Sequence, residues 1–421
     1  MPKPTAALIT GFCAAWLVAH QATRAEAQEA SADAPAAEAP APAETPVVSN
    51  TAPPATQAAD PRPVVQAPAS PVETAPAVEP TVAPAAKELA PLKIATWMHL
   101  SNRFQNFGDP QKLDRFSQEN ILYLIATGDV VEKIGYQLAL VAQYGPTSPT
   151  SGSINGSVTI LDAIAKLDLS EPFNVWAGRM LVPSDRSNFS GFWFQAPWYY
   201  PGGYYNAISG DNSFFGAPVG PRQGPAGRND GVTVWGQFGG GLFKYYAGAY
   251  DAFSADNNPL ISSRINLALI NPEPGYFHSS VYYGTKDILA IGASAQYQKS
   301  KGGAKDYSEI SADILFEKNF HGAGTLDLES TVYKYFASAM DLSYYVTASY
   351  LTPEKIGPGF IQPLVRLQQA KPVGQDIWTI VEAQLGYIIS QDAARIALGY
   401  QWQKAGGIKS NALYVGLQLM K

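Results

Sequence analysis

The sequence predicts an all-β fold, a transmembrane antiparallel β-barrel, from three features of residues 93–421. Runs of about ten residues alternate apolar and polar side chains, as IGYQLALVAQ does at 134–143 and ARIALGYQWQ at 394–403. These runs match the 9–11 tilted residues with which a strand crosses a bilayer. Aromatic residues recur near the ends of the runs, as in the girdles of membrane barrels: Trp97, Trp176, Trp235, Trp378, Tyr387 and Trp402.

The alternation by itself leaves two folds open. In a soluble sandwich the apolar face of each strand packs on a core and the polar face meets water. In a membrane barrel the apolar face meets lipid and the polar face lines the lumen. The sequence after Leu92 has no sustained helical periodicity, so we expect one large β domain over 93–421 in either case.

An export signal at the start of the chain favours the membrane barrel. Lys3, the apolar stretch 6–19 and the small-x-small site at 25–27 predict a signal peptide over residues 1–27. Its apolar stretch is shorter than the roughly 20 residues of a spanning helix. Cys13, the single cysteine, lies in this segment, so the mature chain would have no disulfide or thiol chemistry. We therefore expect export through the general secretory route to the outer membrane of a Gram-negative bacterium.

Residues 28–92 differ sharply in composition from the rest of the chain. They contain 14 of the 33 prolines, many alanines and no aromatic residue. Such a segment cannot bury enough apolar surface to offset its chain entropy, so we predict a disordered periplasmic linker. It is either a solvated tether or a spacer that contacts the cell wall.

Sixteen strands can be assigned in order, and an even number suits a barrel with both ends in the periplasm. The assigned strands are 93–106, 116–127, 134–144, 156–168, 173–183, 231–238, 242–253, 260–270, 288–298, 306–316, 325–337, 342–351, 359–369, 377–388, 393–404 and 410–420. Residues 271–287 are interpreted as one long turn. A strand hidden there would change the count, so 14 and 18 strands are the alternatives.

Three stretches of the sequence resemble a known family. They are FSQENILYLIATGDVVEKIGYQLALVAQY at 116–144, the strand around Asp162, and FNVWAGRMLVPSDRSN at 173–188. They resemble the bacterial phosphate-selective porin O/P family and related general porins. The resemblance implies a homotrimeric passive channel, an inward-folded third external loop, and anions such as phosphate as candidate solutes. The phosphate-binding relatives depend on a lysine cluster, whereas the corresponding loop here has no lysine, which favours a general diffusion channel.

The predicted third external loop, residues 184–230, is much longer than the other predicted external loops. A structureless loop of this length in a compact domain is usually functional. A 16-stranded barrel leaves an aqueous lumen, so we expect the loop to fold inward and narrow it. Its aromatic residues would form the packed core of the loop. These are Phe192, Trp193, Phe194, Trp198, Tyr199 and Tyr200. An external cap and a patch for another chain are the alternatives.

Charged residues of the loop and of the predicted inner wall are the candidates for setting ion selectivity, because charges act strongly in a narrow passage. The pore-lining or constriction candidates are Asp185, Arg186, Arg179, Arg222, Arg228, Asp230, Lys244, Arg264, Arg366, Arg395, Glu382 and Asp162. Both signs occur among them, which again suits a general diffusion channel. For each residue, an ordinary solvated wall position is the alternative.

Other chemistries have little support in the sequence. His99, His278 and His321 lie far apart without metal-like spacing, and no serine–histidine pairing can be assigned. No glycine-rich phosphate loop or basic patch is present, so neither a cofactor nor a nucleic-acid partner is expected. The chain is not predicted to be an enzyme. The alternative from another class is a structural or adhesive outer-membrane barrel whose Pro/Ala arm engages the cell wall.

Overall fold

The computed structural model describes residues 92–106, 115–146, 154–201, 227–250, 258–300, 306–336, 340–405 and 407–421. The predicted signal peptide and all of the predicted linker except Leu92 lie outside these ranges, as does Arg222. Among the described residues, no helix is long and apolar enough to cross a membrane.

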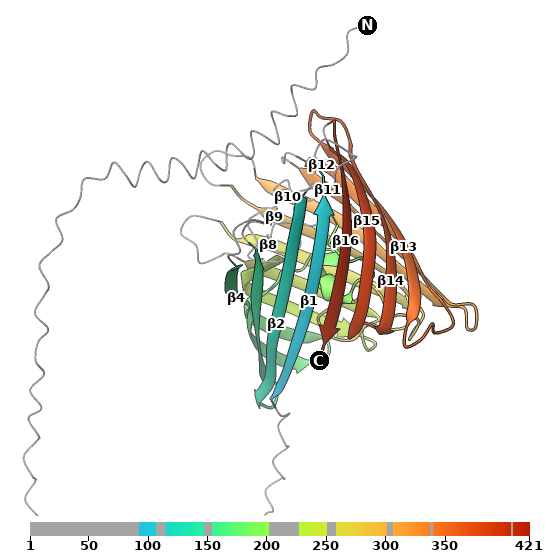
Figure 1. Ribbon diagram of the computed structural model, residues 1–421. Helices are drawn as coiled ribbons and strands as arrows, with labels where there is room; N and C mark the ends of the chain where they lie inside the picture. Colours follow the sequence, from blue (N-terminus) through green and yellow to red (C-terminus); the bar gives the residue numbers. More distant parts are fainter. Residues whose placement is uncertain are drawn as a thin grey trace, which may run out of the picture. The chain divides into compact units, whose positions relative to one another are not determined.

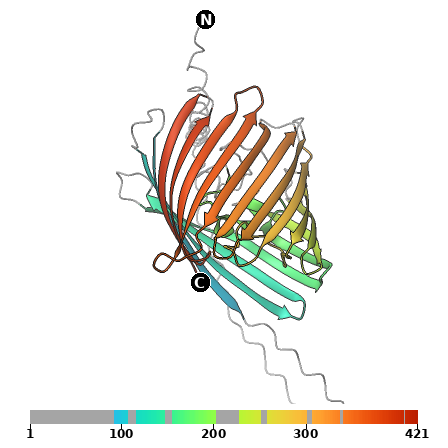
Figure 2. The same cartoon turned by 90° about the vertical axis from the view of Figure 1, so that its right-hand side faces the viewer.

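Sixteen β-strands form one closed antiparallel barrel in which each strand pairs with its neighbours in sequence and β1 pairs with β16 (Figures 1 and 2). The first eight are β1 (Lys93–Gln105), β2 (Arg115–Val131), β3 (Ile134–Pro146), β4 (Ile154–Ser170), β5 (Phe173–Leu181), β6 (Arg228–Phe238), β7 (Phe243–Tyr250) and β8 (Leu260–Ile270). The others are β9 (Ile288–Gln298), β10 (Tyr307–Asn319), β11 (Thr325–Phe336), β12 (Met340–Leu351), β13 (Phe360–Pro372), β14 (Trp378–Ser390), β15 (Ala394–Ala405) and β16 (Ile408–Met420). The predicted barrel of 16 strands is confirmed.

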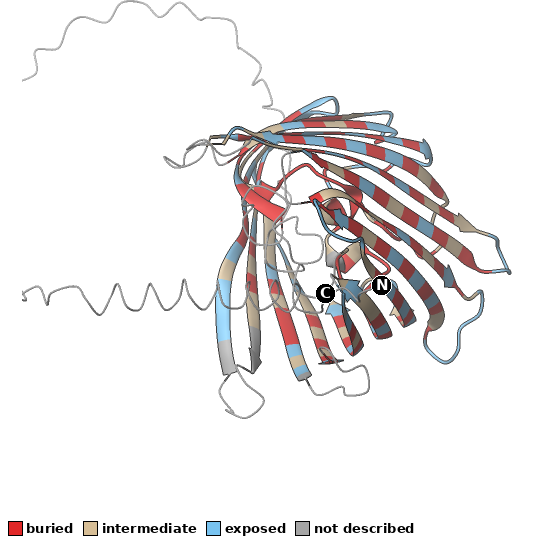
Figure 3. Ribbon diagram, turned by 90° about the horizontal axis from the view of Figure 1, so that it is seen from above, coloured by how far each residue is buried: buried red, intermediate tan, exposed pale blue. Residues whose placement is uncertain are grey.

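The period-2 alternation separates an apolar outer face from a polar inner face. In β13, Leu364, Arg366 and Gln368 point inward and are at most 2% exposed. Between them, Val365 and Leu367 point outward and are 59% and 39% exposed. Figure 3 shows the same stripes of buried and exposed residues along the other strands. A soluble sandwich would bury the apolar face instead, so the arrangement contradicts that alternative.

The prediction that Arg179 and Asp230 line the lumen is wrong. β5 turns Trp176 and Met180 inward, and Arg179 points outward with its side chain 30% exposed. There its Nη2 contacts Oδ2 of Asp230 at 2.8 Å. The inner face of β5 is apolar because it packs on a segment inside the barrel, where Trp176 stacks on Tyr276 with ring centroids 4.3 Å apart.

Most of the tryptophans assigned to interface girdles also point inward. Those that pack against other inner residues are Trp97, Trp176, Trp235 and Trp378. Trp402 and Tyr387 alternate with inward residues and lie on the outer face. Two connecting segments, described below, fill part of the interior, and inward tryptophans such as Trp97 and Trp176 pack against them.

Both ends of the strand ring lie at one rim, which is the lower rim in Figure 1. There the backbone N–H of Thr96 donates to the carbonyl of Lys421 at 2.7 Å. The connection from β5 to β6, residues 182–227, leaves from the opposite, upper rim and is called the inward loop. The connection from β8 to β9, residues 271–287, leaves from the lower rim and is called the lower turn. Residues 182–201 of the inward loop and the whole lower turn contact residues inside the barrel.

Candidate functional site

The inward loop begins with a short capped helix. Pro183 and Ser184 end the extended chain, and α2 (Arg186–Ser190) follows, then the 3-10 turn η1 (Phe192–Phe194). Asp185 caps α2: its carboxylate accepts a hydrogen bond from the backbone N–H of Asn188 at 3.2 Å, as an N-cap residue does. Viewed along the barrel axis, this part of the loop lies inside the ring of strands (Figure 3).

Arg186 of α2 is fully buried. Its two terminal nitrogens donate to the two carboxylate oxygens of Glu273 at 2.7 Å each, a bidentate pair. It also donates to the carbonyl of Ser279 at 2.7 Å and to Oδ1 of Asn266 at 3.2 Å. Burial alone would raise the pKa of Glu273, but the adjacent Arg186 outweighs it and holds that pKa well below its usual range. Both partners are therefore charged.

A second buried ion pair holds the root of the inward loop against the wall. Arg264 of β8 donates to both carboxylate oxygens of Asp313 on β10, with Nη2 at 3.0 Å from Oδ1. The same guanidinium donates to the carbonyl of Ser184 at 2.8 Å. Asp185 is buried beside this pair, and burial followed by the charge of Asp313 raises its pKa. The carbonyl of Ser184 and the side chain of Arg186 therefore attach the loop to the wall, and Asp185 caps α2.

The far part of the loop is held by side chains of the opposite wall. Arg366 of β13 donates to the carbonyl of Tyr199 at 2.8 Å, and Arg395 of β15 donates to that of Gln195 at 2.5 Å. The backbone N–H of Trp198 donates to Gln384 of β14 at 2.8 Å. These bonds replace the sheet hydrogen bonds that the chain gives up when it leaves the barrel wall.

The aromatic residues of the loop pack against the wall in separate clusters, so the expectation of a core internal to the loop is wrong. Trp193 meets Trp97 and Tyr123 with ring centroids 5.4 and 5.0 Å apart. Trp198 stacks on His99 at 3.9 Å. Tyr199 packs on Tyr414 of β16. Tyr200 and Phe194 belong to the same cluster as Trp193. Of Phe192 only the backbone is described. Because the inner wall is itself aromatic, the five described side chains each pack against wall residues.

The remaining predicted charges lie on the inner wall and are bonded. Arg228 pairs with Asp162 at 3.1 Å, and Arg366 pairs with Glu382 at 2.6 Å. Lys244 of β7 donates to the carbonyl of Gly275 in the lower turn at 3.1 Å. Among the described residues, no group of three or more histidine, cysteine or acidic side chains is arranged to hold a metal ion.

Sequence reasoning missed that the lower turn enters the barrel. It identified residues 271–287 as a long turn but placed none of them in the lumen. Glu273, Tyr276, His278 and Tyr282 all contact residues inside the barrel. The signal was available in the sequence, because this turn has the same glycine, proline and aromatic content that marked the inward loop.

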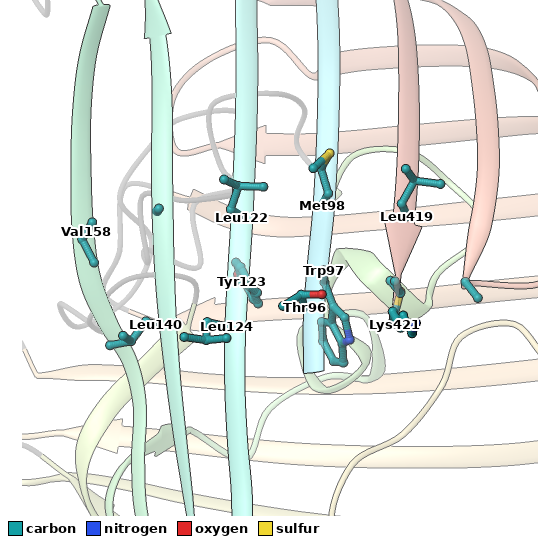
Figure 4. Close-up of a pocket in the computed structure, with 13 residues that line it drawn as sticks. Thr96, Trp97, Met98, Leu122, Tyr123, Leu124, Leu140, Val158, Leu419 and Lys421 are labelled. Atoms are coloured by element: carbon teal, nitrogen blue, oxygen red, sulfur yellow. The ribbon is translucent and has the colours of Figure 1, made fainter. Parts of the chain in front are cut away.

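A separate groove of about 510 Å³ lies on the outer wall near the lower rim (Figure 4). Its outward lining is apolar and comes from neighbouring strands, with Leu122 of β2, Leu140 of β3 and Val158 of β4. Most of its lining belongs to the outer apolar face, while Trp97 and Tyr123 reach it from the inner face.

The fold matches solved porin structures. The chain is similar to OprB of Pseudomonas putida, with a TM-score of 0.54 and 10% identity over 78% of this chain and 94% of that one. It is also similar to OmpF of Salmonella typhi, with a TM-score of 0.53 and 9% identity over 78% and 97% of the two chains. At these identities the likeness establishes a shared fold, that of a 16-stranded porin barrel. No family model and no curated protein matches the sequence.

Proposed function

We propose that the chain is an outer-membrane porin, a water-filled channel for passive diffusion of small hydrophilic solutes and ions. The observation that carries this proposal is the distribution of side chains in a closed barrel of 16 strands. Apolar residues such as Val365 and Ile265 cover the outside, and charged residues such as Arg264 line the inside. Barrels of this size enclose an aqueous passage, and the inward loop is suited to narrow it.

The inner charges support a general channel more than a phosphate-selective one. The guanidinium groups of Arg186, Arg264 and Arg366 are each neutralised by a carboxylate, so they present little free positive charge. Within the described residues, Lys244 bonds carbonyls, and Glu309 and Glu329 accept hydrogen bonds from Tyr307 and Tyr345, so neither sign of charge is in clear excess among the inner residues without an ion pair. Anions such as phosphate would therefore pass as ordinary solutes, without a dedicated site.

The same proposal includes the location and surroundings of the protein. The apolar outer face would meet outer-membrane lipid after export. The resemblance to porins supports a homotrimer and a role in transport instead of catalysis. Contact of the Pro/Ala arm with the cell wall stays a prediction, because the arm lies outside the described residues.

Planar-bilayer recording tests the proposed function directly. Purified, folded protein should insert in uniform conductance steps with an ohmic current–voltage relation, because a passive pore has no energy source. In a salt gradient the reversal potential should be small, because most inner charges are paired. A folded protein that never conducts would contradict the proposal, and a strongly anion-selective current would contradict the account of the charges.

A further inference from the structure

The lower turn is much longer than the connection between its strands requires. β8 and β9 remain paired down to Ile270 and Leu289, and the side chain of Asn271 donates to the carbonyl of Asp287 at 2.7 Å. Because the two ends lie side by side, a loop of roughly 2–5 residues would close the hairpin. The turn between β2 and β3 has only residues 132 and 133. The additional length of the lower turn therefore serves something other than connection.

The lower turn crosses the lumen from one wall to the other. At one side Tyr276 stacks on Trp176 of β5, and its hydroxyl donates to the carbonyl of Leu181 at 3.1 Å. At the other side Val281 and Tyr283 pack in one cluster with residues of β12, β13 and β14. In a closed ring of 16 strands, β5 and β13 are opposite each other. The turn therefore spans the full width of the barrel.

Direct contacts join the lower turn to the inward loop. The pair of Arg186 and Glu273 links the two segments through buried charges. The backbone N–H of Ser280 donates to the carbonyl of Phe194 at 2.8 Å. The hydroxyls of Ser190 and Ser280 share a hydrogen bond of 3.0 Å. The two segments thus form one layered structure inside the barrel.

Wall residues also fix the lower turn along its length. Lys244 donates to the carbonyls of Gly275 and Phe277 at 3.1 and 3.3 Å. The carboxylate of Glu317 accepts hydrogen bonds from the backbone N–H groups of Tyr282 and Gly284 at 2.6 and 2.5 Å. A segment held at both sides in this way is a fixed strut and not a hinged lid.

We infer that the lower turn is a second constriction element, entering from the lower rim and acting in series with the inward loop. This inference rests on the proposed function, because it assigns a part of the solute path. Phe277 is its candidate specificity-determining residue. The side chain is 36% exposed, and its ring lies 6.2 Å from that of Trp176 on the inner face of β5. Phe277 therefore combines an exposed side chain with a position beside the inner face of β5.

The first experiment shortens the turn. Residues 272–286 are replaced by Asn-Gly, which closes a two-residue hairpin. The matched control replaces residues 353–358 of the exposed turn between β12 and β13 by the same dipeptide. Because removing a strut enlarges the free cross-section, single-channel conductance should rise about two-fold or more in the first variant and stay unchanged in the control. Equal conductance of the shortened variant and the wild type would overturn the inference.

The second experiment keeps the turn intact and so does not depend on the shortened barrel folding. Phe277→Asp should shift the reversal potential in a salt gradient towards cation selectivity, and Phe277→Lys should shift it towards anion selectivity. Ile356→Asp and Ile356→Lys, at an exposed lower-rim position, should leave it unchanged. A wild-type protein without conductance would reject the proposed function itself. A conducting wild type with no shift in either Phe277 variant would reject only the role of the lower turn.

Discussion

Arg186 shows at the scale of one residue how the interior is organised. A planar guanidinium presents five donors in a fixed fork, so one side chain can bind a carboxylate in bidentate fashion and still reach other acceptors. Arg186 uses this fork for Glu273, Ser279 and Asn266. A lysine has three donors on a flexible stem and could not hold the same set of acceptors in one plane. The residue therefore joins the inward loop, the lower turn and β8.

The pair of Arg186 and Glu273 should show strong coupling in a double-mutant cycle. Arg186→Met leaves the buried carboxylate of Glu273 without its arginine and should destabilise the folded barrel by about 3–5 kcal/mol. Glu273→Met should cost less, because Arg186 keeps a second carboxylate, that of Asp313, 3.7 Å away. The double variant should lose much less than the sum. The outward pair of Arg179 and Asp230, with side chains 30% and 57% exposed near the upper ends of β5 and β6, should couple more weakly. Urea unfolding of vesicle-inserted protein measures both cycles, and additive effects at Arg186 and Glu273 would contradict the assignment.

Asp392, in the turn between β14 and β15, should make stability depend on pH. Burial raises the pKa of its carboxyl to about 6 from 3.8, and the nearby Arg395 offsets part of that increase. The folded protein thus binds this proton more tightly than the unfolded chain, so stability decreases as pH rises from 4 to 6. Asp392→Asn should be more stable than wild type by on the order of 2 kcal/mol at neutral pH, with no advantage at about pH 4. Thermal unfolding in detergent at both pH values tests this, and a constant difference would argue against it.

At the scale of elements, the sequence could predict the strands but not what fills the space between them. Alternation is a local property, so it located all sixteen strands and the inward positions of Arg264, Arg366 and Arg395. It failed at β5, because Trp176 faces inward only where the lower turn packs on it. The path of the lower turn depends on contacts with distant strands, and no local pattern encodes those contacts. For the same reason the sequence could not predict which wall residues contact the aromatic residues of the inward loop.

The docking of the inward loop on β16 depends on a glycine. An ideal Cβ at Gly416 would lie 2.1 Å from a ring carbon of Trp198, so Gly416→Ala must displace the ring. We expect residues 195–200 to detach in part, at a cost of about 1–3 kcal/mol, as overpacking usually causes. Hydrogen exchange should therefore speed up in that segment. Gly386→Ala on β14 is the control, because its Cβ would lie 3.3 Å from its nearest neighbour. Similar exchange rates in the two variants would show that the docking of Trp198 does not depend on a glycine at position 416.

At the scale of the whole molecule, the protein reverses the usual arrangement of a soluble fold. Its outer surface is apolar, and its interior holds ion pairs whose partners come from strands and loops far apart in sequence. Buried charges stabilise a structure only when each one is paired and hydrogen-bonded. That requirement explains why both inward segments carry charged anchors and why the wall residues donate to loop carbonyls. A barrel that places such a network in its lumen needs a nonpolar medium outside.

Substitution in the outer face distinguishes a lipid medium from water. Val365 lies midway along β13 and is 59% exposed, between Ala348 and Ala383 on the neighbouring strands. In lipid, Val365→Arg should destabilise the barrel by about 2–4 kcal/mol, because a charge near the bilayer midplane loses its hydration. Val365→Leu should have little effect, and Ile356→Arg in the exposed turn should be close to neutral. Urea titration of protein folded into phospholipid vesicles measures all three. An exposed valine in water tolerates arginine, so a neutral Val365→Arg would mean that this face does not contact lipid.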